Sequence, residues 1–333
     1  MGRYTARRLL QFIPVLFGTL FLLHYLQSLS IQFGGDPVAS LFGDRQPPEA
    51  TLRAISRVFG LDDPCLDQRG NPCLGMFVDR LANYARGDFG IDFNRQPITD
   101  LILRALPITL RLTLIAVAFE CVLGIVAGVL AAIGKDRFID NFVRISTVFI
   151  ISVPLFVLGV LVQIGAGLYL KPWLEGLGAP EWFTAAFSIL YQSEHPWASL
   201  VVPGMVLGAL SLGFIARLTR TSLIEILRAD FVRTARAKGL PGSRVVGVHA
   251  LRNALIPVIT YIGIDIGALM GGALVTEGIF NIPGVGGLVF SAVQRKETPV
   301  VIAVVTLLTL VFLVTSLLVD LLYAVLDPRI RYE

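Results

Sequence analysis

Long uninterrupted apolar runs restrict what this chain can fold into more than any other feature of its sequence. Each run can supply the roughly 20 residues that a helix needs to cross about 30 Å of hydrocarbon. Only helices and closed barrels satisfy their backbone hydrogen bonds inside lipid, and these runs lack the alternation of barrel strands. The sequence therefore predicts an all-α polytopic membrane protein. Its six transmembrane helices are expected at residues 9–31, 101–133, 143–170, 198–218, 254–276 and 299–325.

Composition agrees with lipid as the main solvent. The chain is 55% hydrophobic and 16% charged, whereas soluble domains average about 25% charged residues. The 28 Lys and Arg residues lie between the apolar runs and not on one face or tail, so we expect no nucleic-acid partner. The three cysteines and three histidines match no metal-ligand spacing, and no metal site is expected.

The first run competes with a signal-peptide interpretation, because Arg3, Arg7 and Arg8 precede it. Signal sequences have an apolar core of roughly 7–15 residues that ends in a small-x-small cleavage site. Residues 9–31 exceed that length and contain no such site. We therefore expect a retained first transmembrane helix.

Basic residues in the short connections predict the orientation. One side carries Arg3, Arg7, Arg8, Lys135, Arg137, Arg144, Arg329, Arg331 and eight Lys or Arg residues between 217 and 252. The short loops of the opposite side carry only Lys171, Arg295 and Lys296. By the positive-inside rule both termini face the cytoplasm. Residues 33–100 are then external, and loops of that length are exempt from the rule.

The external segment 33–100 is predicted to fold as a small cap. Residues 48–59 indicate a helix with Pro48 in its first turn and Gly60 at its end. Cys65 and Cys73 lie eight positions apart on the oxidising side of the membrane. A disulfide between them is chemically permitted there, and we predict that it forms.

The connection 219–253 is the largest cytoplasmic feature. Asp230 is predicted to N-cap a short basic helix that ends before a left-handed Gly239. Ser243 is predicted to cap a second helix. A connection that carries only topology charges is the alternative, but it would not need two capped helices and a glycine stop. We therefore favour a docking surface, in which small alanines leave room for another protein. Its residues are Asp230, Arg233, Thr234, Ala235, Arg236, Ala237, Lys238, Gly239 and Leu240.

The helix predicted at 254–276 has two distinct faces. One is a small-xxx-small face suited to close helix packing, formed by Gly263, Gly267 and Gly271. The other is polar and could line a substrate passage; it comprises Tyr261, Asp265, Gly272 and Thr276. A charge at mid-membrane usually marks a pathway or a pair. The alternatives for Asp265 are a buried pair with a residue of a partner chain and a protonated acid. For Glu120, alone in the second helix, we favour structural hydrogen bonding.

Several motifs in order resemble one transporter family. Arg233-Thr234-Ala235, three residues and then Gly239 resemble the Glu-Ala-Ala-x3-Gly coupling loop of ABC-importer permeases, with the first two positions changed. Further motifs resemble the dipeptide/oligopeptide permease subfamily, as its first permease, over nearly the whole chain. They are Gly35-Asp36-Pro37, residues 60–64, residues 86–90, Leu255-Ile256-Pro257, residues 272–287 and residues 320–331. The stretch from Cys65 to Cys73 departs from the subfamily.

The resemblance implies the fold of an ABC type I importer permease in the bacterial inner membrane. It also implies a second homologous permease, two ATPase subunits and an extracytoplasmic substrate-binding protein as partners, in addition to membrane lipid. ATP and Mg would be held by the ATPase subunits, with no cofactor in this chain. The chain has no G-x-x-x-x-G-K-[ST] motif to cradle phosphates. It is therefore expected not to be an enzyme.

Other functions are less well supported by the sequence. Glutathione and nickel-chelate importers share much of this permease pattern, so the cargo stays open between them and peptides. A proton-coupled secondary transporter could use Glu120, Asp265 or Asp320, but paired repeats with broken helices are not visible. An intramembrane enzyme would need motifs such as G-x-S-x-G or H-E-x-x-H, and the sequence has neither.

Overall fold

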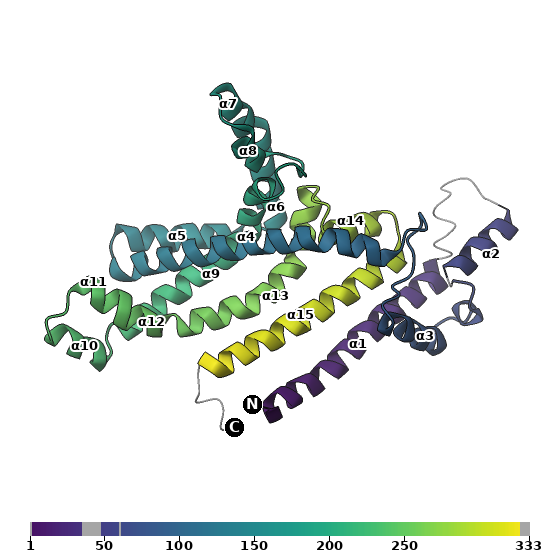
Figure 1. The fold of residues 1–333 in the computed structure, drawn as a ribbon, viewed down its shortest axis with the longest axis horizontal. Coiled ribbons are helices and arrows are strands. Elements are labelled where there is room, and N and C mark those ends of the chain that lie inside the picture. The colour runs from purple at the N-terminus through teal and green to yellow at the C-terminus, as the bar shows by residue number, and fades with distance from the viewer. Residues whose placement is uncertain (1, 35–47, 60, 327–333) are drawn as a thin grey trace. The chain divides into compact units, whose positions relative to one another are not determined.

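The computed structural model describes residues 2–34, 48–59 and 61–326. This part of the chain is almost entirely helical (Figure 1), and its one β-bridge joins Ile91 and Pro97. The motifs Gly35-Asp36-Pro37 and Asp327–Arg331, together with Gly60, lie outside the described residues.

The expected all-helical architecture with several membrane spans is confirmed. Among the described residues, the helices that are long and apolar enough to cross a membrane are Leu10–Gly34, Ile98–Ile133, Leu155–Gly176, Ala198–Ile226 and Thr298–Leu318. A sixth span is formed if Gly242–Ala254 and Ile256–Gly271, which meet at a bend of 49°, are taken together. The structure thus has five to six spans where the sequence predicts six.

The chain divides into two compact units. The first combines residues 1–108 with residues 283–317, and the second combines residues 109–282 with residues 318–333. The helices of the first unit are α1 (Gly2–Gly34), α2 (Glu49–Val58), η2 (Pro64–Asp67), α3 (Leu74–Ala85), the start of α4 (Ile98–Ile133), α14 (Val285–Gln294) and most of α15 (Thr298–Leu326).

The predicted cap helix exists as α2, with one change. The sequence places Pro48 in its first turn, whereas the structure places Pro48 at the N-cap position, just before Glu49. Its φ of −53° and ψ of 141° are extended, and its missing N–H costs nothing there because the first amides of a helix have no partner.

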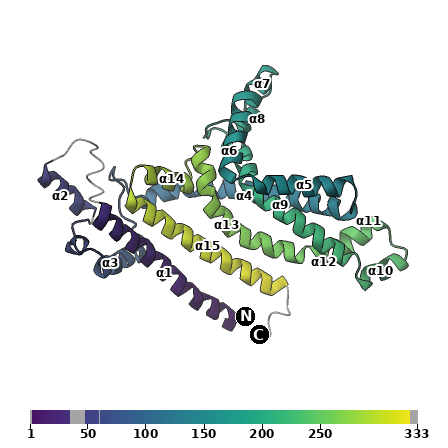
Figure 2. The same cartoon turned by 180° about the vertical axis from the view of Figure 1, so that it is seen from behind.

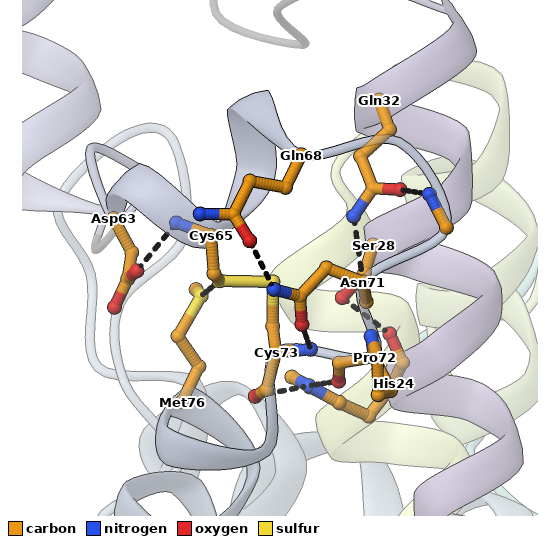
Figure 3. The surroundings of a disulfide bond; sticks show 11 residues. His24, Ser28, Gln32, Asp63, Cys65, Gln68, Asn71, Pro72, Cys73 and Met76 are labelled. Carbon is orange, nitrogen blue, oxygen red and sulfur yellow. Dashed lines mark hydrogen bonds between the residues drawn. A yellow bond between two sulfur atoms is a disulfide. The ribbon is translucent and has the colours of Figure 1, made fainter.

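A disulfide joins Cys65 and Cys73, whose Cα atoms are 5.5 Å apart (Figure 3). His24, on α1 and only 1% exposed, holds the same loop. Its Nε2 atom lies 3.2 and 3.1 Å from the carbonyl oxygens of Pro72 and Cys73. Because both partners accept hydrogen bonds only, Nε2 carries the proton. Gln32 adds two further hydrogen bonds from α1 to this loop.

The second unit is built around α4, α9 and α13. After Thr109 of α4 its helices are α5 (Phe138–Ser152), α6 (Leu155–Ile164), η3 (Gly165–Leu170), α7 (Lys171–Gly176), α8 (Glu181–Thr184), η4 (Ala185–Phe187), η5 (Ala198–Leu200), α9 (Val201–Ile226), α10 (Asp230–Ala237), α11 (Gly242–Arg244), η6 (Val245–Ala250), α12 (Leu251–Ala254) and α13 (Ile256–Ile279). Helix α9 packs against α5, α6, α12 and α13.

The prediction of one continuous third helix at 143–170 is wrong. Helix α5 ends at Ser152 and α6 begins at Leu155, and the two run in clearly different directions (Figures 1 and 2). The break lies at Val153-Pro154. Proline disfavours the helical conformation of the residue before it, and Val153 is accordingly extended, with φ −90° and ψ 124°. The span that follows the break is Leu155–Gly176.

Four glycines allow α4 and α9 to pack closely. They are Gly124 and Gly128 on α4 and Gly204 and Gly208 on α9. A Cβ added at Gly128 would lie 2.5 Å from the Cβ of Thr219, and one added at Gly208 would lie 2.7 Å from the carbonyl oxygen of Ala116. Both pairs have the small-xxx-small spacing, which the sequence analysis applied only to 254–276.

The glycine face predicted on α13 is only partly used within this chain. Gly263 and Gly267 are buried, whereas Gly271 is exposed. A Cβ added at Gly271 would meet nothing within 4 Å. Packing of this face inside the chain therefore ends before Gly271.

Candidate functional site

Helix α10 is amphipathic and packs its apolar side onto its own chain. Val232 is fully buried and Ala235 is 7% exposed, in a cluster that includes Leu223 of α9 and Val245 of η6. The predicted N-cap is wrong, because Ala229 holds that position and Asp230 is the first helical residue. The Asp230 carboxylate instead pairs with Arg233 at 3.3 Å on the exposed surface.

The opposite side of α10 is open to solvent. Arg233, Thr234, Arg236, Ala237 and Lys238 are exposed. Two residues along a helix differ by about 200° in direction, so Ala237 faces outward where Ala235 faces inward. The expectation that Ala235 contacts another protein is therefore wrong, since its methyl group fills this chain's own core.

Phe231 lies at the border between the buried and the exposed side of α10, and the sequence analysis did not single it out. Its ring is 45% exposed at the start of the helix. The sequence could have indicated this residue. If Val232 and Ala235 form the buried side of the helix, helical spacing places Phe231 at the edge of that side. Aromatic residues and arginine are enriched in protein–protein interfaces.

The end of α10 follows the predicted glycine stop. Gly239 has φ +76°, the left-handed conformation, and its N–H donates to the Arg236 carbonyl at 2.9 Å. Leu240 then packs on the buried cluster. The predicted Ser243 cap is wrong, because Pro241 is the N-cap residue and α11 begins at Gly242.

Two polar contacts tie this region to α9. The Ser222 hydroxyl donates to the Ala254 carbonyl at 2.9 Å, so α12 is fastened to α9 just before the bend. Asp140, fully buried at the start of α5, accepts two hydrogen bonds from the Arg220 guanidinium at 2.5 and 2.6 Å. These bonds lower the pKa of Asp140 to about 2. The sequence analysis missed this pair, because 80 positions separate the two residues.

A second polar site lies among the membrane-spanning helices. Glu120 of α4 is 0% exposed, and its neighbour is Asp265 of α13. The side chains of Ser211 on α9 and Tyr261 on α13 also reach the Asp265 carboxyl. Structural hydrogen bonding was favoured for Glu120, and the residue it meets is Asp265. The alternative for Asp265 was a buried pair with a residue of a partner chain, whereas its neighbour here belongs to the same chain.

The remaining residues of the predicted polar face differ in their surroundings. Tyr261 is half-buried and contacts the Phe214 ring, with centroids 6.1 Å apart. Thr276 is only 1% exposed. The expectation that it lines a substrate passage is therefore not met within this chain. Gly272 lies within α13.

A second contact shows that α4 and α13 run antiparallel. The Thr109 hydroxyl of α4 donates to Glu277 of α13 at 2.6 Å. Glu120 lies 11 residues after Thr109, and Asp265 lies 12 residues before Glu277. The Thr109–Glu277 and Glu120–Asp265 contacts therefore fit one antiparallel register of α4 and α13. They lie about 17 Å apart along the helix axes.

Comparison with known proteins identifies the family. The family model for the binding-protein-dependent transport system inner membrane component matches residues 124–332. The glutathione transport system permease protein GsiC of Escherichia coli K12 is 36% identical over 344 aligned residues, which cover 100% of both chains. The di/tripeptide transport system permease protein DppB of Pseudomonas aeruginosa is 35% identical over 348, again with both chains covered completely.

These similarities agree with the span-rich fold and with the order of motifs along the chain. The expected multi-pass inner-membrane location and the assignment as a transport component, not an enzyme, are confirmed. The family also works together with ATPase and substrate-binding components. The chain therefore belongs to the inner membrane components of binding-protein-dependent transport systems, the membrane-spanning permeases of ABC importers.

Proposed function

We propose that this chain is the permease subunit of an ATP-driven importer of short peptides. Full-length similarity to a glutathione permease and to a di/tripeptide permease supports this cargo class. Glutathione is itself a tripeptide, so the two relatives share one cargo chemistry. The chain would form half of the translocation pathway, and a second homologous permease would complete it.

ATP and Mg would be held by two ATPase subunits that dock on the cytoplasmic loops of the permeases, and α10 would be the docking element of this chain. The supporting observation is the outward face of α10, where the exposed Phe231 and Ala237 lie beside Arg233, Arg236 and Lys238. Arginine and aromatic residues are enriched where proteins bind one another. An extracytoplasmic binding protein would deliver the peptide to the opposite side of the membrane.

Motion at α10 has a direct route to the pore helices. Val232 and Ala235 lock α10 onto α9 and η6, and η6 leads through α12 to the 49° bend before α13. Packed cores transmit displacements as rigid units because they have few voids. A displacement of α10 by ATP-driven closure of the ATPases would therefore reach α13, which carries Asp265.

The test replaces the outward alanine and compares it with the inward one. In the complete transporter reconstituted in liposomes, Ala237→Glu should lower dipeptide uptake and peptide-stimulated ATP hydrolysis at least about tenfold, because bulk and negative charge enter a basic contact. Ala237→Ser keeps the residue small and should leave both rates within about twofold. Membrane insertion and the melting temperature of the isolated chain should stay normal in both variants.

Ala235→Glu serves as the contrasting variant, because a buried carboxylate should destabilise the chain itself. Unchanged uptake and unchanged ATPase stimulation in Ala237→Glu would overturn the docking role of α10. A wild-type complex that imports neither dipeptides nor glutathione would overturn the cargo assignment.

A further inference from the structure

Glu120 and Asp265 form a carboxyl pair in the part of the bundle where α4, α9 and α13 meet. Both residues lie within candidate membrane spans. Glu120 is completely buried, whereas Asp265 is partly exposed. The Glu120 end of the pair, on α4, is therefore closed to a ligand, whereas the Asp265 end, on α13, is open to one.

The pair has more hydrogen-bond acceptors than donors. Both carboxyl oxygens of Glu120 and the Oδ2 atom of Asp265 are buried without a hydrogen bond of good geometry. The hydroxyls of Ser211 and Tyr261 are the neighbouring donors, and each has one hydrogen to give. Buried polar atoms are normally satisfied, so these oxygens can accept hydrogen bonds from a ligand that reaches the pair.

Charge restricts the nature of a ligand for this pair. Two carboxyl groups side by side in low-dielectric surroundings favour a cation over a neutral group, because the cation compensates their negative charge. Asp265 is the member that a ligand can reach, since Glu120 is completely buried.

A metal ion fits this site poorly. Among the described residues no group of three or more His, Cys, Asp or Glu side chains could hold one. An alkylammonium group matches better, because it brings one positive charge and three N–H donors to a site rich in acceptors.

We propose that Glu120 and Asp265 form an ammonium-binding site within the permease, in which Asp265 receives the amino terminus of the passing peptide and the buried Glu120 supplies a second acceptor behind it. This inference rests on the proposed function as a peptide importer. Attraction between the partly exposed Asp265 and an ammonium group is moderate, which suits a transporter because a site that trapped its cargo would stop transport.

The experiment measures uptake by the complete wild-type and variant transporters in liposomes. Each is given one dipeptide with a free amino terminus and the same dipeptide N-acetylated. The binding protein is identical in every sample, so its own preference cancels when each variant's ratio of rates is divided by the wild-type ratio.

Asp265→Asn keeps the size of the side chain and removes its charge. It should lower uptake of the free-amine dipeptide about tenfold and uptake of the acetylated form less than about twofold, since the lost contact is a charge-assisted hydrogen bond. Asp67→Asn is the matched control, because it removes the charge of an exposed carboxylate outside the pair. Both rates should therefore stay within about twofold of wild type.

Equal loss of both peptides in Asp265→Asn, or failure of that variant to assemble, would overturn the proposal and make the pair structural. The same selective loss in Asp67→Asn would also overturn the proposal, because the effect would then not be specific to the pair. A wild-type complex that imports neither dipeptide would instead refute the proposed function, whereas normal import with an unchanged ratio in Asp265→Asn would refute this inference alone.

Discussion

At the scale of single residues, the Asp140–Arg220 contact joins two helices of the second unit through a buried carboxylate. The Asp140 carboxylate is completely buried, and the Arg220 side chain is 17% exposed. The backbone N–H of Asp136 also donates to Asp140, at 2.9 Å. A buried ion pair that loses one partner leaves an uncompensated charge, which costs roughly 3–5 kcal/mol. The contact therefore holds the start of α5 against the end of α9.

Asp140→Asn should lower the free energy of unfolding by about 3 kcal/mol. The pKa of Asp140 is lowered to about 2 in the folded protein, below the ordinary value near 3.9. A lowered pKa stabilises the fold above the unfolded value, and that stability is lost as pH falls through about 2. The loss caused by the mutation should therefore be constant between about pH 5 and 8.

Thermal melts of the detergent-purified chain would measure this effect, with the exposed Asp67→Asn as the control. Equal melting temperatures for the two variants would contradict a stabilising pair. A loss that changes across the neutral range would contradict the low pKa of Asp140.

At the scale of elements, backbone proximity holds α4 and α9 together. Atoms of Ala116 and Thr219 occupy the space where side chains at Gly208 and Gly128 would lie. Without water between lipid-embedded helices, association depends on such close van der Waals packing. The close approach of α4 to α9 also turns the Glu120 side of α4 toward α9 and α13. The glycines that let these helices pack therefore also position the carboxyl pair.

Gly208→Ala should destabilise the chain by about 1–3 kcal/mol, because its methyl group would overlap a backbone carbonyl that cannot easily move. Gly165→Ala is the matched control, since nothing lies within 4 Å of a Cβ added there. It should be neutral or slightly stabilising, as helical glycine is about 0.5–1 kcal/mol worse than alanine. Thermal unfolding of both variants in one detergent would distinguish them, and a tolerated Gly208→Ala would contradict close α4–α9 packing.

At the scale of the whole molecule, the distribution of Lys and Arg predicts which loops face the cytoplasm. The coupling region around α10 falls on the basic side, and the segment around α7 and α8 falls on the opposite side. This orientation is required by the proposed function, because ATP is available only in the cytoplasm.

Single-cysteine labelling tests the orientation. In a Cys121→Ala background, Ala237→Cys should react with a membrane-impermeant maleimide only after the cells are permeabilised. Ser193→Cys, in the loop before α9, should react in cells whose inner membrane is intact. The reverse pattern, or reaction of both positions from outside, would contradict cytoplasmic placement of α10.

Local chemistry was enough to predict the helices and several of their ends. The second and sixth spans, expected at 101–133 and 299–325, appear as α4 (Ile98–Ile133) and the helix Thr298–Leu326. The left-handed Gly239 was also foreseen, because only glycine adopts that conformation without strain. Hydrophobicity, charge and backbone preference are properties of neighbouring residues, so they can be read from a short window of sequence.

The amino-acid sequence by itself thus determined that the chain spans a membrane, which family it resembles and where its helices lie. Only the tertiary structure decided that Val153-Pro154 breaks the third predicted helix, that Ala235 faces inward, and that Glu120 meets Asp265. Glu120 and Asp265 are 145 positions apart, and their meeting depends on the register in which α4, α9 and α13 pack. That register is selected by the fit of many side chains at once, a collective property that no single stretch of sequence contains.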